Sequence, residues 1–238
     1  MEPFLKNKTA VVTGGTRGIG YAIARSLAHA GAAVAICGRT ADAVDKAVAS
    51  LSQDTGAHIS GMVVDIRQAE AVTRFFEFVD AQFGGPDVLV NNAGLGIFRP
   101  VAELSFEDWR TTLDTNLSGA FYCCREALPR MQGRGGGYIV NISSLAGKNP
   151  FAGGAAYNAS KFGLNGFSEA LMLDHRKDKI RVTYVMPGSV ATEFSPGESG
   201  TEWKIAPEDV ADVVMMVLNM PARTTVSRIE MRPSIPQK

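Results

Sequence analysis

The feature that most constrains the fold is a regular alternation of short apolar runs with longer amphipathic segments. The apolar runs are nearly free of polar residues, which is the pattern of strands covered on both faces of a parallel sheet. They lie at 9–14, 32–37, 59–65, 87–92, 137–144, 181–188 and 225–231. The segments between them predict helices at 18–30, 41–54, 67–83, 105–131, 155–176 and 207–219. This order predicts an α/β fold, with a doubly wound, seven-stranded parallel sheet and helices on both faces.

The length and uniformity of the chain bear on its domain organisation. A chain of 238 residues suits one large α/β domain or two small ones. The sequence contains no internal repeat, low-complexity tract or linker. We therefore expect one domain over residues 1–238.

Residues 189–206 form the only long irregular stretch of the sequence and are rich in Gly, Ser, Pro and Glu. Long loops in compact domains are usually functional, so this stretch predicts a short flap beside a binding site. Because it has few apolar anchors, we expect it to be mobile without ligand and ordered over a bound one. Phe194 and Trp203 are candidates for contacts to the ligand; the alternative is that they pin the flap to the domain.

Composition narrows the classes of function. Lys plus Arg number 24, as do Asp plus Glu, so no net charge favours nucleic acid or an anionic membrane. No uncharged apolar run is long enough to span a bilayer, and the N-terminal residues lack the apolar core of a signal peptide. Cys37, Cys123 and Cys124 show no C-x-x-C spacing and the three histidines are scattered, which predicts packing cysteines and no metal site. We expect a cytoplasmic protein.

A glycine-rich stretch follows the first predicted strand. It reads TGGTRGIG over 13–20 and opens the first predicted helix, with Gly14, Gly18 and Gly20 spaced G-x-x-x-G-x-G. Glycines permit a tight turn and a close backbone approach, and the free N–H groups at a helix N-terminus bind a pyrophosphate. The alternative is a plain strand-to-helix turn. The strand before it and the helix after it favour a dinucleotide site.

A second motif places a phenol and an ammonium on one helix face. In YNASK (157–161), Tyr157 and Lys161 are four positions apart, which makes them neighbours on a helix. A nearby ammonium favours the phenolate, so the pKa of Tyr157 is expected to fall from its usual value of ~10. The motif predicts an acid/base tyrosine tuned by lysine, although the pair alone also fits ordinary exposed helix residues.

Further motifs lie at strand ends and within one helix. NNAG (91–94), NISSLAG (141–147) and PGSVAT (187–192) end the fourth, fifth and sixth predicted strands, and Asn116 lies in DTNLSGAF inside a predicted helix. Together with TGGTRGIG and YNASK, they resemble the short-chain dehydrogenase/reductase family over nearly the whole chain. The resemblance implies a single Rossmann domain that binds a dinucleotide and catalyses a reaction. It also implies a homotetramer with two-fold symmetry, built partly on the helices at 105–131 and 155–176.

The resemblance implies a role for each catalytic motif residue. Tyr157 is the acid/base, and Lys161 lowers its pKa and binds the nicotinamide ribose. Ser144, thirteen residues before Tyr157, holds the substrate oxygen, and its neighbour Ser143 is the residue with which it could be confused. Asn116 distorts its helix and orders a water that links Lys161 to solvent. Such a site interconverts a carbonyl and an alcohol by hydride transfer, with proton exchange at Tyr157.

The implied cofactor contacts come from the same motifs and from the ends of the second and third strands. They are Gly14, Thr16, Arg17, Gly18, Ile19, Gly20, Arg39, Asp65, Ile66, Asn92, Ala93, Gly94, Tyr157, Lys161, Val190 and Thr192. By the resemblance, Asp65 contacts the adenine, and Val190 and Thr192 bond the nicotinamide carboxamide.

The residues after the second strand bear on the choice between NAD and NADP. NAD-binding members of this architecture place an acid there, which accepts bonds from the ribose hydroxyls. Here Gly38 and Arg39 follow the strand, Asp42 and Asp45 come later, and Arg17 lies in the glycine turn. Two guanidiniums without a carboxylate predict NADP(H), because arginine binds phosphate with a fixed fork of donors. The alternative is two solvated arginines and dual specificity.

The C-terminal segment bears on the substrate. The tail RTTVSRIEMRPSIPQK lacks the TG…VDGG ending of many 3-oxoacyl-carrier-protein reductases. It is more similar to NADP-dependent serine and 3-hydroxy acid dehydrogenases, which implies a small keto or hydroxy substrate. A 3-oxoacyl-carrier-protein reductase is the enzymatic alternative, and a non-catalytic dinucleotide sensor is the alternative of another class. A sensor has no need of Ser144, Tyr157, Lys161 and Asn116 together, which favours the enzyme.

Overall fold

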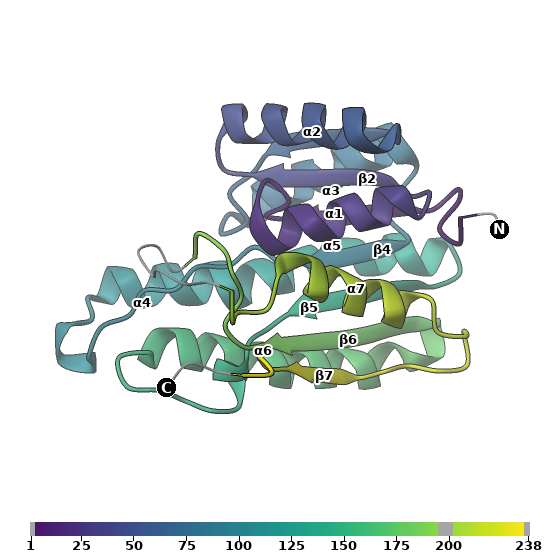
Figure 1. Ribbon diagram of the computed structural model, residues 1–238. Coiled ribbons are helices and arrows are strands. Elements are labelled where there is room, and N and C mark those ends of the chain that lie inside the picture. The colour runs from purple at the N-terminus through teal and green to yellow at the C-terminus, as the bar shows by residue number, and fades with distance from the viewer. Residues whose placement is uncertain (1–2, 195–201, 236–238) are drawn as a thin grey trace.

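The structure is a computed structural model that describes residues 3–194 and 202–235. Seven parallel strands form one sheet in the order β3-β2-β1-β4-β5-β6-β7 (Figure 1). The strands are β1 (Thr9–Thr13), β2 (Ala33–Gly38), β3 (Ile59–Val63), β4 (Val88–Asn91), β5 (Gly137–Ile142), β6 (Ile180–Pro187) and β7 (Arg228–Met231). The predicted seven-stranded parallel sheet is confirmed.

Helices cover both faces of the sheet, as predicted (Figure 1). They are α1 (Gly18–His29), α2 (Ala41–Thr55), α3 (Ala69–Phe83), α4 (Phe106–Leu113), α5 (Gly119–Gly133), α6 (Ala155–His175) and α7 (Pro207–Leu218). Successive strand residues point to opposite faces, so Val12 packs in a core with α1, α2 and α7, and Val11 in a core with α3, α5 and α6. Burial on both sides explains why the strands read as continuous apolar runs.

The segment 105–131, predicted as one helix, contains a distortion. Helix α4 leads into a π-helical turn, Asp114–Ser118, which continues into α5. Asn116 lies in this turn, and its amide group bonds both the N–H and the carbonyl of Leu95, each at 2.8 Å. π-Turns inside α-helices occur frequently at functional sites.

Five strands, β1, β3, β4, β5 and β7, are shorter than predicted. β5 ends at Ile142, because Ser144 instead caps a short 3₁₀ helix, Leu145–Gly147, by accepting a hydrogen bond from the N–H of Ala146 at 3.1 Å. β7 begins only at Arg228. Just before it, the carbonyl of Val226 accepts a hydrogen bond from the side-chain hydroxyl of Thr183 on β6 at 2.6 Å.

The order of the strands determines where a ligand site forms. The chain runs outward from β1 to β3 on one side of the sheet and from β4 to β7 on the other, so the direction reverses between β1 and β4. In doubly wound sheets the crevice for a ligand lies at the carboxyl ends of the strands at this point.

No helix in the described part of the chain is long and apolar enough to cross a membrane.

Candidate active site

A groove of about 1210 Å³ opens at the carboxyl ends of the strands. Sixteen of the predicted site residues line it: Gly14, Thr16, Arg17, Gly18, Ile19, Arg39, Asp65, Ile66, Asn92, Ala93, Gly94, Ser144, Tyr157, Lys161, Val190 and Thr192. Gly20 and Asn116 lie behind the wall of the groove and are buried. The fold therefore brings together residues from segments that are far apart in the sequence.

The glycine turn has a backbone that other residues rarely adopt. Gly14 and Gly18 have φ angles of 63° and 55°, in the left-handed region that glycine tolerates. A Cβ atom at Gly14 would also lie 2.9 Å from the Cα of Ala93, on the neighbouring NNAG segment. The N-terminus of α1 begins at Gly18, so its free N–H groups face the groove. This cradle fits the pyrophosphate of a dinucleotide.

Side-chain bonds fix the floor of the groove between β1 and β4. The hydroxyl of Thr13 accepts the N–H of Asn92 at 3.0 Å and that of Ala93 at 3.1 Å. In return, the amide of Asn92 donates to the carbonyls of Thr13 and Gly14, at 3.0 and 3.1 Å. The side chain of Asn92 thus holds the glycine turn in place, and the backbone of 92–94 remains as the surface that faces a ligand.

Lys161 and Asn116 flank Gly94. Lys161 is 4% exposed, and its ammonium donates a hydrogen bond to the carbonyl of Ile142 at 2.9 Å. Burial lowers the pKa of Lys161 from 10.5 to about 8. Asn116 is also buried, and it donates to the hydroxyl of Ser160 at 3.0 Å. A Cβ atom at Gly94 would lie 3.3 Å from the side-chain oxygen of Asn116 and 3.7 Å from the Lys161 nitrogen, so a side chain there would crowd both polar groups.

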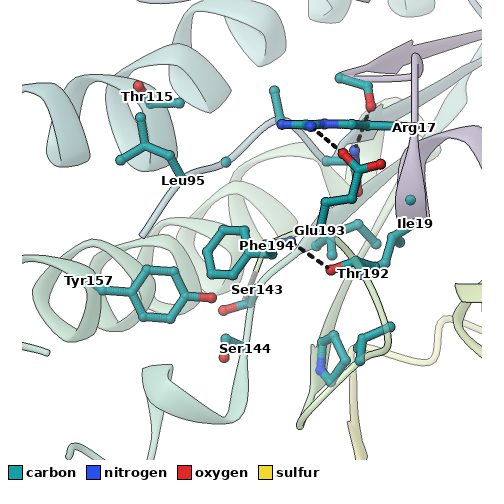
Figure 2. Close-up of a pocket in the computed structure, with 18 of the residues that line it drawn as sticks. Arg17, Ile19, Leu95, Thr115, Ser143, Ser144, Tyr157, Thr192, Glu193 and Phe194 are labelled. Atoms are coloured by element: carbon teal, nitrogen blue, oxygen red, sulfur yellow. Dashed lines mark hydrogen bonds and ion pairs between the residues drawn. The ribbon is translucent and has the colours of Figure 1, made fainter. Parts of the chain in front are cut away.

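Tyr157 lies near Ser144 in the groove, and Figure 2 shows its phenol directed toward the two serines. Burial raises the pKa of Tyr157 above 10, and a hydrogen bond with Ser144 opposes this rise. The sequence predicts that Lys161 lowers this pKa. The structure differs, because the Lys161 ammonium turns to a backbone carbonyl and lies 5.8 Å from the centre of the Tyr157 ring.

The structure distinguishes Ser144 from Ser143. The hydroxyl of Ser143 is buried and donates to the side chain of Asn165 on α6 at 2.5 Å. Ser144 is only partly buried and lies beside the phenol of Tyr157 in the groove. Ser143 therefore ties β5 to α6, and Ser144 is the serine placed to contact a substrate.

The charged residues of the groove have partners that sequence reasoning missed. Arg17 forms an ion pair with Glu193, and Figure 2 shows the Glu193 carboxylate facing the Arg17 guanidinium. Asp65 accepts bonds from the guanidinium of Arg67, which lowers the pKa of Asp65, and Arg39 lowers it further by its charge. The D-x-R spacing of Asp65 and Arg67 was the available signal. No comparable signal pairs Arg17 with Glu193, which are 176 residues apart.

Two phenylalanines of the groove were also missed. Phe98 and Phe151 lie in loops outside every recognised motif and line the wall beside Tyr157, together with Phe194. Phe194 and Trp203 line the groove as well; residues 195–201 of the predicted flap lie outside the described residues.

Among the described residues, no cluster of His, Cys, Asp or Glu could hold a metal ion.

Comparison with known proteins identifies the family. Residues 8–202 match the profile of the short chain dehydrogenase family. The chain is a short-chain dehydrogenase/reductase. As a member of this family it is an NAD(P)-dependent oxidoreductase with a Rossmann-like fold.

Similarity to known proteins extends along nearly the whole chain. The NADP-dependent 3-hydroxy acid dehydrogenase YdfG of Salmonella typhi is 36% identical, over 94% of this chain and 94% of that protein. A crystal structure of a metagenomic short-chain oxidoreductase in complex with NADP superimposes with a TM-score of 0.86 at 36% identity, covering 98% of this chain and 99% of that one. The L-sorbose reductase of Gluconobacter frateurii, complexed with NADPH and L-sorbose, gives a TM-score of 0.90 at 28% identity, with 98% of each chain covered.

Proposed function

We propose that this short-chain dehydrogenase/reductase interconverts a carbonyl and an alcohol with NADP(H), on a small keto or hydroxy substrate such as a 3-hydroxy acid. The observation that carries the proposal is the meeting of Ser144, Tyr157 and Lys161 in the groove that also holds the glycine turn. A non-catalytic dinucleotide sensor would have no use for these three groups at one point.

The groove fits a dinucleotide together with a substrate. Its volume of about 1210 Å³ exceeds the roughly 300–1,000 Å³ of an ordinary small-molecule pocket. The left-handed glycines at 14 and 18 and the N-terminus of α1 suit the pyrophosphate. Bound NADP(H) supplies hydride to a carbonyl carbon or accepts it from an alcohol.

The side chains of the site then handle the oxygen and its proton. The hydroxyl of Ser144 donates a hydrogen bond to the substrate oxygen and stabilises the negative charge that develops there. The raised pKa of Tyr157 keeps its phenol protonated at neutral pH, so it has a proton to give in the direction of reduction. Lys161, with a pKa of about 8, is a proton source close to neutrality, and Asn116 holds the backbone of Leu95 beside it. Oxidation reverses each step.

The proposed preference for NADP(H) rests on Arg39 and Arg17. Both line the cofactor side of the groove, and Gly38 ends β2 without an acid. Thr16 packs on Gly38, where a Cβ atom would lie 2.6 Å from its methyl group, so the turn and the strand end meet closely at this point. The relatives named as NADP-dependent, or solved with NADP(H), support the same choice.

We also propose a single domain over 1–238, with residues near 189–206 bordering the substrate, and a homotetramer. Exposed apolar side chains on one group of helices support an assembly: Phe106 and Trp109 of α4, Phe121 of α5, and Phe162 and Leu173 of α6. Phe106 is 90% exposed, and burying such rings in an interface is favourable. Light scattering on wild type and on a Leu173→Arg variant tests this; a monomeric wild type would contradict it.

The function is tested by absorbance assays of NADPH oxidation with a panel of β-keto esters, aldehydes and quinones, and of NADP reduction with 3-hydroxy acids. We expect turnover of at least one class by wild type and a kcat roughly 10²–10⁴-fold lower in Tyr157→Phe. Bound NADPH without turnover of any carbonyl or alcohol would contradict the proposal and favour the sensor.

A further inference from the structure

Three phenylalanine rings surround the ring of Tyr157. The centroids of Phe98, Phe151 and Phe194 lie 5.5, 6.5 and 5.8 Å from that of Tyr157. Phe98 also contacts Phe151 at 5.5 Å and Phe194 at 6.3 Å, in edge-on geometry. These distances fall in the range of about 4.5–7 Å at which aromatic rings attract one another. We call Phe98, Phe151 and Phe194 the aromatic wall.

The aromatic wall is exposed to the groove. Phe98, Phe151 and Phe194 are 46%, 45% and 42% exposed, and all three line the cavity that contains Tyr157. Figure 2 shows the ring of Phe194 beside the phenol of Tyr157. Large apolar side chains left uncovered inside a cavity mark a site for an apolar group of a ligand.

The backbone around the wall holds its rings in place. A Cβ atom at Gly96 would lie 2.5 Å from the ring of Phe98 and 2.9 Å from that of Phe194, so both rings pack directly on the glycine. A Cβ atom at Gly154 would lie 2.6 Å from the ring of Phe151. The carbonyl of Phe151 accepts a bond from the amide of Asn158 at 3.1 Å, next to Tyr157 on α6.

The two loops that carry Phe98 and Phe151 are also joined to each other. Arg99 and Gly154 form an isolated parallel bridge between them. Two charged groups elsewhere in the groove have partners of opposite sign, because Arg17 binds Glu193, and Arg232 binds Glu230 at 3.3 Å. The side of the Tyr157 ring that meets Phe98, Phe151 and Phe194 is therefore apolar, whereas Ser144 and Lys161 supply the polar groups near this ring.

We propose that the aromatic wall is a substrate subsite, and that it selects carbonyl compounds whose carbonyl carbon carries an aromatic ring. The inference rests on the proposed function, because the phenol of Tyr157 fixes where the carbonyl oxygen lies. A ring attached to the carbonyl carbon then falls against rings that surround the same phenol. Edge-to-face contacts there reward an aryl group over a methyl group.

The competing explanation is that the three rings only pack against one another and anchor residue 194. Both explanations predict that removing a ring weakens the loop contacts. Only a subsite makes the loss depend on which group the substrate carries, so the test compares two substrates that differ in that group alone.

Ethyl benzoylacetate and ethyl acetoacetate form such a pair, since a phenyl replaces a methyl on the reacting carbonyl. We expect wild type to reduce the phenyl ester with a kcat/KM roughly tenfold or more above that of the methyl ester, given the 10–200-fold value of a single methylene in an apolar pocket. In Phe98→Ala, the ratio of the two values should fall by about tenfold. Phe4→Ala, at a matched 44% exposure outside the groove, should leave the ratio unchanged.

A binding measurement separates recognition from chemistry. Tyr157→Phe with NADPH bound should hold the phenyl ester more tightly than the methyl ester, as read from the dissociation constants by NADPH fluorescence. Phe98→Leu, which keeps an apolar side chain, provides a second variant that preserves the fold if Phe98→Ala does not.

The outcomes are distinct. A phenyl preference that falls in the Phe98 variants and persists in Phe4→Ala supports the subsite. Reduction of both esters with equal efficiency, or a ratio unchanged by the Phe98 variants, overturns the subsite and leaves the proposed function standing. Reduction of neither ester by a chain that binds NADPH counts against the proposed function, and the inference falls with it.

Discussion

The cofactor half of the groove, around Gly14, Gly18 and Arg39, is formed largely by backbone, whereas the half around Tyr157 is formed by aromatic side chains. In the first half, a Cβ atom at Gly14 would strike the neighbouring segment, so only glycine serves there. In the second half, Gly96 and Gly154 are also restricted, but by the aromatic rings that pack on them and not by backbone. From this difference we infer that the backbone conformation fixes the shape of the cofactor site. The shape of the substrate site depends on side chains and can change when they are substituted.

The largest expected effect on catalysis comes from Tyr157, where the cofactor half and the substrate half of the groove meet. Tyr157→Phe should lower kcat by roughly 10²–10⁴-fold, because it removes the proton donor and keeps the ring. NADPH affinity should stay near that of wild type, since the cradle of Gly14 and Gly18 is untouched. Steady-state kinetics and a fluorescence titration check both statements. A variant with nearly wild-type kcat would show that the proton comes from elsewhere.

Lys161 joins the two halves, and its buried charge should affect stability. Burial lowers its pKa from 10.5 to about 8, so between these pH values the unfolded chain keeps a proton that the folded chain has lost. The free energy of unfolding should therefore rise with pH across this window relative to Lys161→Met, by about 3 kcal/mol at ~1.36 kcal/mol per pH unit. Below about pH 8 the difference should be level.

Urea unfolding at a series of pH values measures this difference. Lys46→Met, on the exposed face of α2, controls for the loss of a lysine charge. Parallel pH curves for wild type and Lys161→Met would contradict the burial of a charged ammonium.

The Arg39→Asp variant tests whether the positive charge of Arg39 makes the cofactor half prefer NADPH. A charge-assisted bond to the 2′-phosphate contributes about 1.5–3 kcal/mol, so the variant should lose about ten- to a hundredfold in kcat/KM with NADPH. Efficiency with NADH should be equal or higher, because a carboxylate can accept bonds from the ribose hydroxyls. The same assay with both cofactors on any accepted carbonyl decides the matter. Equal efficiency of wild type with NADPH and NADH would remove the basis of the proposed preference.

A pair of glycine substitutions gives the smallest effect and the most direct contrast between the halves. Gly18→Ala puts a Cβ atom on a residue with φ of 55°, which costs about 1–2 kcal/mol and should raise the KM for NADPH roughly tenfold. Gly96→Ala displaces the rings of Phe98 and Phe194 and should raise the KM for the carbonyl substrate by a few-fold.

Gly18→Ala should leave the KM for the carbonyl substrate nearly unchanged, and Gly96→Ala should leave the KM for NADPH nearly unchanged. Gly133→Ala, where an added Cβ meets nothing within 4 Å, is the control for glycine replacement itself. If Gly18→Ala and Gly96→Ala raised the same constant, the separation of the groove into two independently built halves would be wrong.

The sequence by itself determined the sheet, its seven strands, the helices on both faces and the place of the groove. These follow from local patterns, because burial on two faces imposes continuous apolar runs and a nucleotide turn imposes glycines. The sixteen predicted residues that line the groove lie in such motifs or directly after predicted strands. The sequence also indicated buried cysteines, and Cys37, Cys123 and Cys124 are all free and buried.

Only the tertiary structure decided how the side chains are paired. It assigned Ser143 to Asn165 and Ser144 to Tyr157, and it turned the Lys161 ammonium to a backbone carbonyl, so that burial and not a nearby charge dominates the pKa of Tyr157. It also brought Phe98 and Phe151 together across more than fifty positions of sequence. Sequence motifs indicate the backbone conformation and the burial that each position requires. Contacts between distant loops depend on where the whole chain places them, so no local pattern carries that information.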